Sequence, residues 1–147
     1  MILEQLPPNI TGLGPGQDPA AFKAACHLVA RMEQGSVERF DLNLLARSYY
    51  AATIRTRTDE LSVLCNGVYP YLAFVAANSF GPDMEFVAPS GLASRFSDLT
   101  GFQTLDADWL NSAPEPGMLR GLAAAELKDF GYWRPKRIGE VIFNHWD

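Results

Sequence analysis

The sequence predicts an α+β fold in a single domain, in which a small antiparallel β-meander packs with helices that precede and follow it. A clear helical pattern comes first, three apolar β-rich segments follow one another with turn signals between them, and helical patterns then return. Grouping of strands and helices, rather than their alternation, is typical of α+β proteins. The length of 147 residues suits one domain with one core.

Residues 1–17 are rich in Pro and Gly and show neither helical nor strand periodicity. We expect a lead-in that packs loosely or not at all, followed by the single α+β domain at residues 18–147. The predicted first helix starts at Asp18 and Pro19, because Asp accepts from free backbone N–H groups and Pro is favoured in a first turn. Gly35 is expected to end it in a left-handed conformation. One face of this helix is apolar at helical spacing: Phe22, Cys26, Val29 and Met32.

The next part of the chain, residues 36–52, predicts a second short helix. Its apolar positions are Phe40, Leu44 and Leu45. The segments ATIRTRT, LSVLC and VYPYLAFVA then predict three antiparallel strands. Asn66 and Gly67 lie between the last two, and this dipeptide favours a two-residue type I′ turn, so we expect a tight hairpin there. Pro70 cannot donate to a strand ladder and is expected at an edge or a bulge.

Helical patterns dominate the rest of the chain. MEFVAP predicts a short strand, and residues 90–99 predict a helix whose inward positions are Leu92, Phe96 and Leu99. DADWLNSA predicts a further helical turn. MLRGLAAAELKDF is helical in composition, although Gly121 interrupts it.

The C-terminal tail, RPKRIGEVIFNHWD, admits two hypotheses. Its apolar residues form one helical stripe: Ile138, Val141, Ile142 and Trp146. This stripe predicts a final helix that closes the core, with Trp133 and Trp146 as large buried side chains. The alternative is a binding face, because aromatic and Arg residues are favoured anchors at protein interfaces. The polar residues that would surround the two tryptophans are Arg134, Lys136, Arg137, Asn144, His145 and Asp147.

The ending WRPKRIGEVIFNHWD resembles a tail pattern of small, acidic, cytosolic bacterial proteins, some of which look like immunity proteins that neutralise secreted toxins. The pattern is Trp-x-Pro followed by a run of Gly, an acidic residue, two apolar residues, Phe, Asn, any residue, Trp and Asp. The resemblance covers about 15 of the 147 residues. It implies a protein partner and brings no family active site with it.

Composition argues against several functional classes. A net charge of −5 disfavours nucleic-acid binding, and no apolar run reaches the roughly 18 residues that a membrane span needs. Glu4 stands where a secretory signal would be basic, so we expect a cytoplasmic protein. Cys26 and Cys65 have no neighbouring Cys or His cluster, which predicts buried thiols and no metal site. The chain has none of the common nucleotide-binding, zinc-hydrolase or serine-hydrolase motifs, so we assign no cofactor and no catalytic residue.

Two arrangements could nevertheless carry chemistry. Cys65, His145 and Asp147 are the residue types of a nucleophilic triad, although with so few Cys and His residues they can occur together by chance. Arg55 and Arg57 would project from the same face of a strand, as would Thr53, and could form an anion-binding row. A solvated sheet face is the simpler interpretation of that row.

The sequence therefore favours a non-enzymatic protein-binding function, in which an immunity-type protein occludes the active site of a toxin. Acidic residues would attract a basic toxin domain, and aromatic residues would anchor it. The expected partner-binding residues are Asp106, Asp108, Trp109, Glu115, Trp133, Arg134, His145 and Asp147. The first alternative is a small anion- or nucleotide-binding domain or enzyme that uses Arg55 and Arg57. The second is a subunit of an obligate oligomer, paired edge to edge through the hairpin strand VYPYLAFV.

Overall fold

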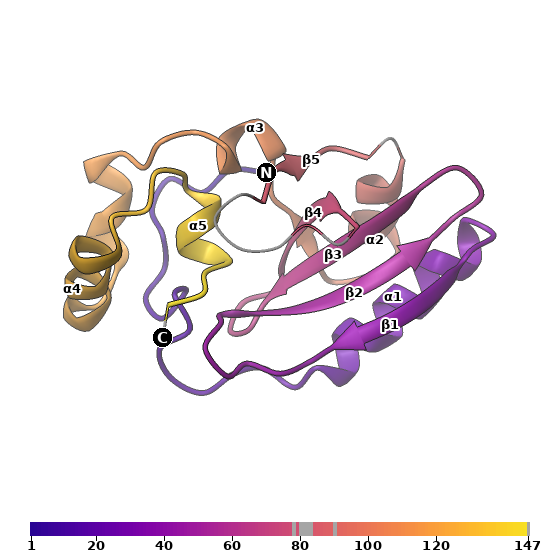
Figure 1. The fold of residues 1–147 in the computed structure, drawn as a ribbon, viewed down its shortest axis with the longest axis horizontal. Coiled ribbons are helices and arrows are strands. Elements are labelled where there is room, and N and C mark those ends of the chain that lie inside the picture. The colour runs from indigo at the N-terminus through magenta and orange to yellow at the C-terminus, as the bar shows by residue number, and fades with distance from the viewer. Residues whose placement is uncertain (78, 80–83, 90, 147) are drawn as a thin grey trace.

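A computed structural model of the chain describes residues 1–77, 79, 84–89 and 91–146. Over these residues it shows a six-stranded sheet with helices before and after it, which confirms the predicted α+β class (Figure 1). The elements, in chain order, are α1 (Ala20–Met32), β1 (Ser36–Asp41), β2 (Tyr49–Arg55), β3 (Glu60–Asn66), β4 (Tyr71–Ala76), β5 (Phe86–Val87), α2 (Leu92–Leu99), β6 (Gln103–Thr104), α3 (Ala107–Leu110), the 3-10 helix η2 (Pro116–Gly121), α4 (Ala124–Trp133) and α5 (Gly139–Ile142).

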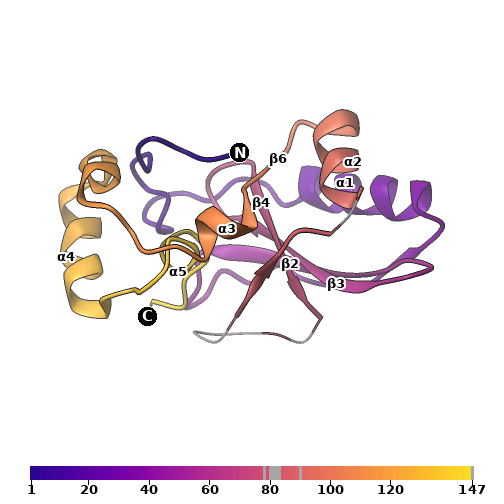
Figure 2. The ribbon, with the colours of Figure 1, turned by 90° about the horizontal axis from the view of Figure 1, so that it is seen from above.

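The sheet is an antiparallel meander in the order β1-β2-β3-β4-β5, and β6 pairs in parallel with β4. Alternation along β2 sends its side chains into two separate cores. Tyr50, Ala52 and Ile54 face α1 and α2, which lie together on one side of the sheet (Figure 2). Tyr49 and Ala51 face the opposite side of the sheet, where α3, α5 and the N-terminal segment contribute to a second core. The tail is therefore built into the second core.

The predicted helix at residues 36–52 is wrong, because β1 and a loop occupy this segment. β1 pairs with β2 from Ser36↔Arg55 to Asp41↔Ala51, with a bulge between Val37 and Arg39. Phe40 packs edge to face with Phe22 of α1, at 6.3 Å between ring centroids. Pairing with β2 and packing on α1 thus outweigh the weak helical pattern in this part of the sequence, which forms an edge strand instead.

The first helix forms as predicted, and Phe22, Cys26 and Val29 are buried, whereas Met32 is exposed. Its end differs from the prediction. Gln34, not Gly35, takes the left-handed conformation, with φ of 57°. Gly35 is instead a site of close approach, because a Cβ atom there would lie 2.1 Å from the carbonyl oxygen of Arg55. Glycine at this position lets the start of β1 lie against β2.

The hairpin between β3 and β4 is wider than the predicted two-residue turn. Residues 67–70 separate the strands, and Gly67 has no positive φ angle. Asn66 is completely buried, and its Oδ1 accepts from the N–H groups of Val68 and Tyr69, at 2.9 Å each. Pro70 lies in this loop, outside the β4 ladder, so it removes no strand hydrogen bond.

Residues 1–17 are more than a loose lead-in. Leu6 and Ile10 are completely buried in the second core, and the Leu6 N–H group donates to the Met118 carbonyl at 2.9 Å. A Cβ atom on Gly121 would lie 2.1 Å from the Leu6 carbonyl oxygen, so this glycine admits the N-terminal segment where η2 ends. The stretch predicted as one helix around Gly121 is accordingly divided into η2 and α4.

The short strand at Phe86–Val87 and the helical turn at Ala107–Leu110 appear where the sequence predicts them. In α2, Leu92 and Phe96 are buried, but Leu99 is exposed. Within the described residues, no helix has the length and apolar character that spanning a bilayer requires.

Candidate functional site: a groove in the C-terminal tail

A hollow in the described part of the surface is formed by the tail. It is lined by residues 133–137, Glu140 and residues 143–146, encloses about 620 Å³, and is called the tail groove below. Its volume lies within the range of about 300–1,000 Å³ that is usual for ligand sites. The connection between α4 and α5 contributes to the lining; α4 lies at the end of the molecule away from α1, and α5 lies between α4 and the sheet (Figure 1).

The backbone of the groove turns at the end of α4. Arg134 takes a left-handed conformation, with φ of 49° and ψ of 58°, and its N–H group donates to the Phe130 carbonyl at 2.9 Å. The Glu140 carboxylate then accepts from the N–H groups of Lys136 and Arg137, at 2.8 Å each. These contacts cap the last turn of α4 and fix the approach to α5.

The inner side of the groove is held by buried polar groups. The Ser48 hydroxyl donates to the Ile142 carbonyl and accepts from the Asn144 N–H group, at 2.8 Å each. The Asn144 side-chain amide donates to the carbonyls of Thr11 and Val141, at 2.9 Å each. Because buried polar groups with partners on several segments allow few alternative arrangements, this end of the tail has a defined conformation.

Burial separates the apolar side chains of the tail that belong to the core from those that lie at the surface. Ile138, Val141, Ile142 and Phe143 are buried, whereas Trp133 is exposed at the end of α4 and Trp146 is half-buried against the second core. The helical stripe is therefore right for the core positions in the middle of the tail. The predicted helix is longer than the observed one, because α5 has only four residues. The prediction that Trp133 is buried is also wrong.

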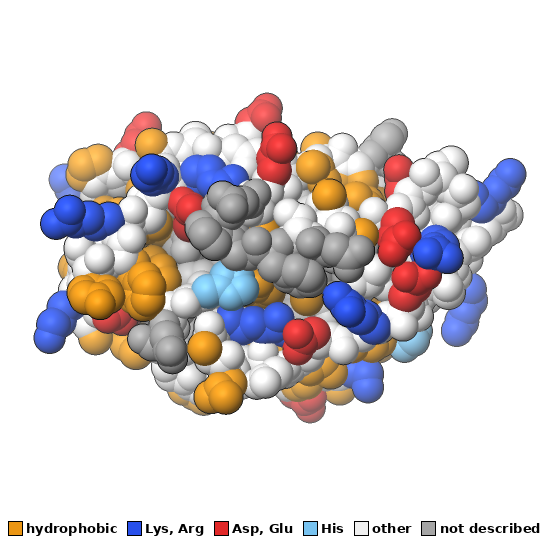
Figure 3. Space-filling model, in the orientation of Figure 1, with side chains coloured by type: hydrophobic (Ala, Val, Ile, Leu, Met, Phe, Trp, Pro, Cys, Tyr) orange, Lys and Arg blue, Asp and Glu red, His pale blue; other side chains and the backbone are white. Residues whose placement is uncertain are grey.

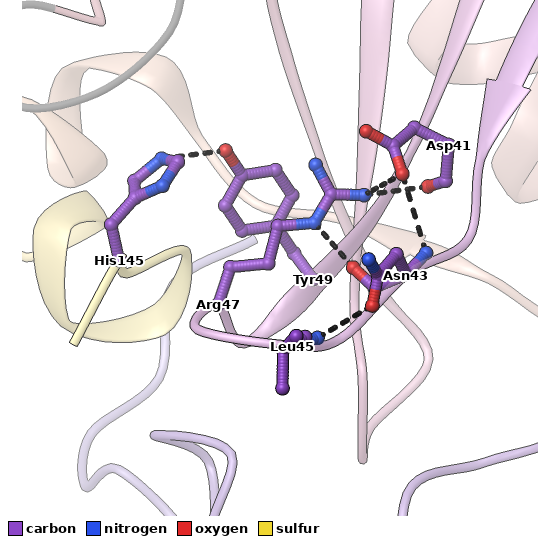
Figure 4. Close-up of polar contacts among 6 residues, drawn as sticks. All are labelled: Asp41, Asn43, Leu45, Arg47, Tyr49 and His145. Atoms are coloured by element: carbon purple, nitrogen blue, oxygen red, sulfur yellow. Dashed lines mark hydrogen bonds and ion pairs between the residues drawn. The ribbon is translucent and has the colours of Figure 1, made fainter. Parts of the chain in front are cut away.

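His145, at the rim of the groove, contacts a cluster on β2 and the loop before it (Figure 4). The Tyr49 hydroxyl lies 2.7 Å from His145 Nε2, and the Arg47 guanidinium stacks 4.8 Å from the centre of the Tyr49 ring. Arg47 is itself held by the Asp41 carboxylate at 2.9 Å and by the Asn43 carbonyl at 2.6 Å. Partial burial of the imidazole, and then the charge of Arg47, lower the pKa of His145 below its ordinary value. Burial is also the main cause that raises the pKa of Tyr49.

We expect Arg47→Gln to raise the pKa of His145 towards its ordinary value of 6.5, because one of the two causes of the shift is removed. In the parent protein, the folded state binds this proton less readily than the unfolded state. The contribution of His145 to stability is therefore fully present above pH 6.5 and is lost as the pH drops towards the lower folded pKa. An NMR titration in a His27→Gln background, where only one imidazole remains, measures the pKa directly. An unchanged pKa in Arg47→Gln, with the fold intact by circular dichroism, would contradict this account.

The groove is cationic as well as aromatic. Among the described residues, no ion pair is found for the side chains of Arg134 and Lys136. Arg137 lies 3.8 Å from the Glu140 carboxylate and donates to Asn111. Glu140 is the only acidic residue among the described residues of the lining, and it is occupied by the backbone groups of Lys136 and Arg137.

An exposed apolar surface continues from the groove onto α4. Tyr132 and Trp133 are 78% and 40% exposed and pack edge to face against each other, at 5.2 Å between ring centroids. Leu127 of the same helix is also exposed. The face in Figure 3 shows hydrophobic and Lys or Arg side chains together at the end of the molecule where α4 lies. Two neighbouring exposed aromatic rings are unusual on a surface that meets only water.

The structure divides the sequence-predicted binding residues into two groups. Trp133, Arg134 and His145 come together in the tail groove. Asp106, Asp108 and Trp109 line a second cavity of about 490 Å³ beside β5 and α3, which shares no residue with the groove. Asp106 there pairs with the N-terminal ammonium group of Met1. Glu115 is exposed next to η2, and Asp147 lies outside the described residues.

The anion-binding row does not assemble around Arg55. Its guanidinium pairs with Glu38 at 3.0 Å and with Glu60 at 3.2 Å, so two carboxylates already offset its charge. Arg57 lies beyond the end of β2 and donates to Gln34, while Thr53 is buried within β2. The three side chains therefore do not present free donors along one strand.

The nucleophilic triad also fails on geometry. Cys65 is completely buried in the core that α1 covers, whereas His145 contacts Tyr49 in the core on the opposite face of the sheet. Burial raises the pKa of the Cys65 thiol, which keeps it protonated. Burial likewise raises the pKa of Cys26. Among the described residues, no three His, Cys, Asp or Glu side chains are grouped so as to hold a metal ion.

Edge-to-edge pairing through the hairpin strand is blocked as well. β4 pairs with β3 along one side, and along the other side with β5 at Phe74–Val75 and with β6 at Tyr71–Leu72. Both edges of the strand are thus occupied within the chain. An oligomer would need another surface.

Sequence analysis missed Arg47, Tyr49 and Ser48, which lay in the segment predicted as a helix. The adjacent tyrosines Tyr49 and Tyr50 could have suggested a strand that sends one ring to each face of the sheet, but no local pattern links Tyr49 to His145.

Comparison with known proteins adds no relative: no family model, curated protein or solved structure matches the chain.

Proposed function

We propose that this protein binds another protein through the tail groove and the adjoining exposed face of α4. The observation that carries the proposal is the pair of exposed rings, Tyr132 and Trp133, at the edge of a groove that also contains Trp146. Aromatic side chains bury a large area at small conformational cost, which makes them effective anchors at interfaces. Because this apolar surface extends beyond the groove along α4, a macromolecule fits it better than an enclosed small molecule does.

The proposed biological role is neutralisation of a cognate bacterial toxin by covering its active site. Support comes from the tail resemblance to immunity-type proteins, since residues 133–146, which carry most of it, are also the part of the chain from which the groove is built. The net charge of −5 suits a partner whose body is basic, because opposite charge speeds the encounter. This role needs no catalytic group on the chain itself.

Trp133→Ala is expected to abolish capture of the partner while leaving the melting temperature within a few degrees of the parent. The side chain is substantially exposed at the end of α4, so its removal costs little core packing. At an interface, by contrast, loss of a Trp anchor weakens binding by ~2 kcal/mol or more, about thirtyfold. The measurement is affinity capture from cells of the native organism, followed by identification of the bound protein and thermal melting of each variant.

The matched control is Leu28→Ala, which removes an exposed apolar side chain from α1 instead. Capture by the parent and by Leu28→Ala, but not by Trp133→Ala, supports the proposed interface. Equal capture of the partner by the parent, Leu28→Ala and Trp133→Ala would show that the interface lies elsewhere on the surface. If the captured protein is not toxic when expressed alone, or if co-expression gives no protection, the toxin role is lost while protein binding remains.

A further inference from the structure

We infer that the tail groove takes a short acidic segment of the protein partner, in which carboxylate groups lie against Arg134 and Lys136 and an apolar side chain lies against Trp133 and Trp146. This inference rests on the proposed function and adds the chemistry of what is bound. It adds to the sequence-based expectation of a basic toxin domain, because the described lining of the tail groove has more cationic than acidic side chains, whereas the whole chain is acidic.

The balance of charge in the groove supports a carboxylate ligand. Among the described residues of its lining, three side chains are cationic, those of Arg134, Lys136 and Arg137, and one carries a carboxylate, that of Glu140. Glu140 accepts two backbone N–H groups and lies near the Arg137 guanidinium, so its oxygens are already committed. It is therefore poorly placed to neutralise Arg134 and Lys136 as well.

The apolar part of the lining determines what must accompany the charge. Trp133 and Trp146 both border the groove, and Phe143 forms part of its inner surface while belonging to the second core. A carboxylate alone would leave these surfaces in water. A segment that also carries a Leu, Phe or Trp side chain would cover them, and each such side chain contributes through the area it removes from water.

The charge of the whole chain limits the size of the acidic ligand. Because the net charge is −5, a large acidic domain would be repelled by the chain as a whole. Screening reduces this repulsion beyond about 8–10 Å at physiological ionic strength, so a short protruding segment can meet the cations without it. The body of the partner can still be basic, as the proposed toxin would be.

The test uses the full chain and a phage-displayed library of random dodecapeptides. We expect the parent to enrich peptides that combine Asp or Glu with a large apolar residue. For one enriched peptide, synthesised with a fluorescent label, the double variant Arg134→Glu/Lys136→Glu should weaken binding by at least about tenfold, because attraction becomes repulsion. Arg31→Glu, which reverses an exposed charge on α1, serves as the control and should bind as the parent does. Raising the salt concentration should weaken parent binding and leave the double variant little changed.

The outcomes separate this inference from the proposed function. Enrichment of basic or uncharged peptides whose binding is lost in Trp133→Ala would leave the groove as a protein-binding site and overturn its acidic specificity. Equal peptide binding by the parent and the folded double variant would also overturn the acidic specificity, because the reversed charges would then make no difference. If no peptide is enriched and Trp133→Ala still captures the partner, both proposals fail. Binding of adenosine monophosphate in place of any peptide would also overturn the inference, since the groove would then be a small-molecule site.

Discussion

Phe143→Ala is expected to lower the free energy of unfolding by about 3–5 kcal/mol, the range for truncation of a buried Phe. The side chain is 1% exposed, and its ring lies 6.1 Å from that of Tyr49 and 5.9 Å from that of Phe86. Since small domains are usually stable by about 5–15 kcal/mol, this loss is a large share of the total. Chemical denaturation monitored by tryptophan fluorescence and by far-UV circular dichroism would measure it.

Trp133→Ala is the informative comparison, because the two aromatic residues belong to the same tail but differ in burial. We expect the larger aromatic residue to cost less stability, since Trp133 is exposed and Phe143 is not. Similar losses in the two variants would mean that α4 packs more firmly in solution than its exposed rings suggest. A small loss in Phe143→Ala would show that the tail contributes little to the second core, and a binding tail would then be separable from the fold.

Local sequence patterns predicted a helix with one apolar face and strands that are apolar on both faces. The α1 pattern worked because Phe22, Cys26 and Val29 repeat at helical spacing and all face the sheet. The strands β3 and β4 were found because both are nearly continuous apolar runs. The α+β class follows from these elements alone.

β1 was missed because an edge strand buries little, and the bulge at Glu38 and Arg39 interrupts the alternation between its partly buried residues, Val37 and Phe40. Its pairing with β2 depends on residues ten or more positions away, which no local pattern contains. The turn at Asn66 was misassigned for a related reason. Its side-chain amide donates to the carbonyls of Ile10 and Ile142, so contacts with both ends of the chain hold the loop that a dipeptide rule treats as local.

The candidate site could be predicted only in part from the sequence. The mixture of aromatic and cationic residues in the tail marked it correctly as a region of interest, because those residue types are enriched at interfaces. The separation of Asp106 and Asp108 from the tail could not be read from composition, which records charge but not its position. The same limit applies to His145 and Tyr49, whose contact spans most of the chain.

Glu126→Ala is expected to destabilise the protein by about 3 kcal/mol or more, because it removes the acceptor of several buried donors. The Glu126 carboxylate is completely buried on α4. It accepts from the N–H groups of Asn9 at 2.6 Å, Thr11 at 3.0 Å and Ala123 at 3.0 Å, and also from the Thr11 hydroxyl. A buried donor left without an acceptor costs about 1–3 kcal/mol, and here more than one is affected.

The measurement combines chemical denaturation with amide hydrogen exchange at Asn9 and Thr11, whose protection should fall in Glu126→Ala. Lys128→Ala on the same helix is the control, because its side chain is exposed. Glu126→Gln should recover part of the loss, since its amide retains one acceptor oxygen but turns a donor towards other donors. Unchanged protection of these two amides would mean that Leu6 and Ile10, rather than the carboxylate, hold the N-terminal segment.

Glu126→Ala should also weaken partner binding, although its side chain does not line the groove. Thr11 donates to Glu126 through its N–H and hydroxyl groups, and its carbonyl accepts from the Asn144 amide at 2.9 Å. Asn144 lines the groove, so release of Thr11 removes one of the contacts that position the tail. Stability and affinity are therefore expected to fall together in Glu126→Ala, whereas Trp133→Ala should lower affinity alone. A Glu126→Ala protein that is less stable but binds with parental affinity would show that the groove keeps its shape without the N-terminal segment.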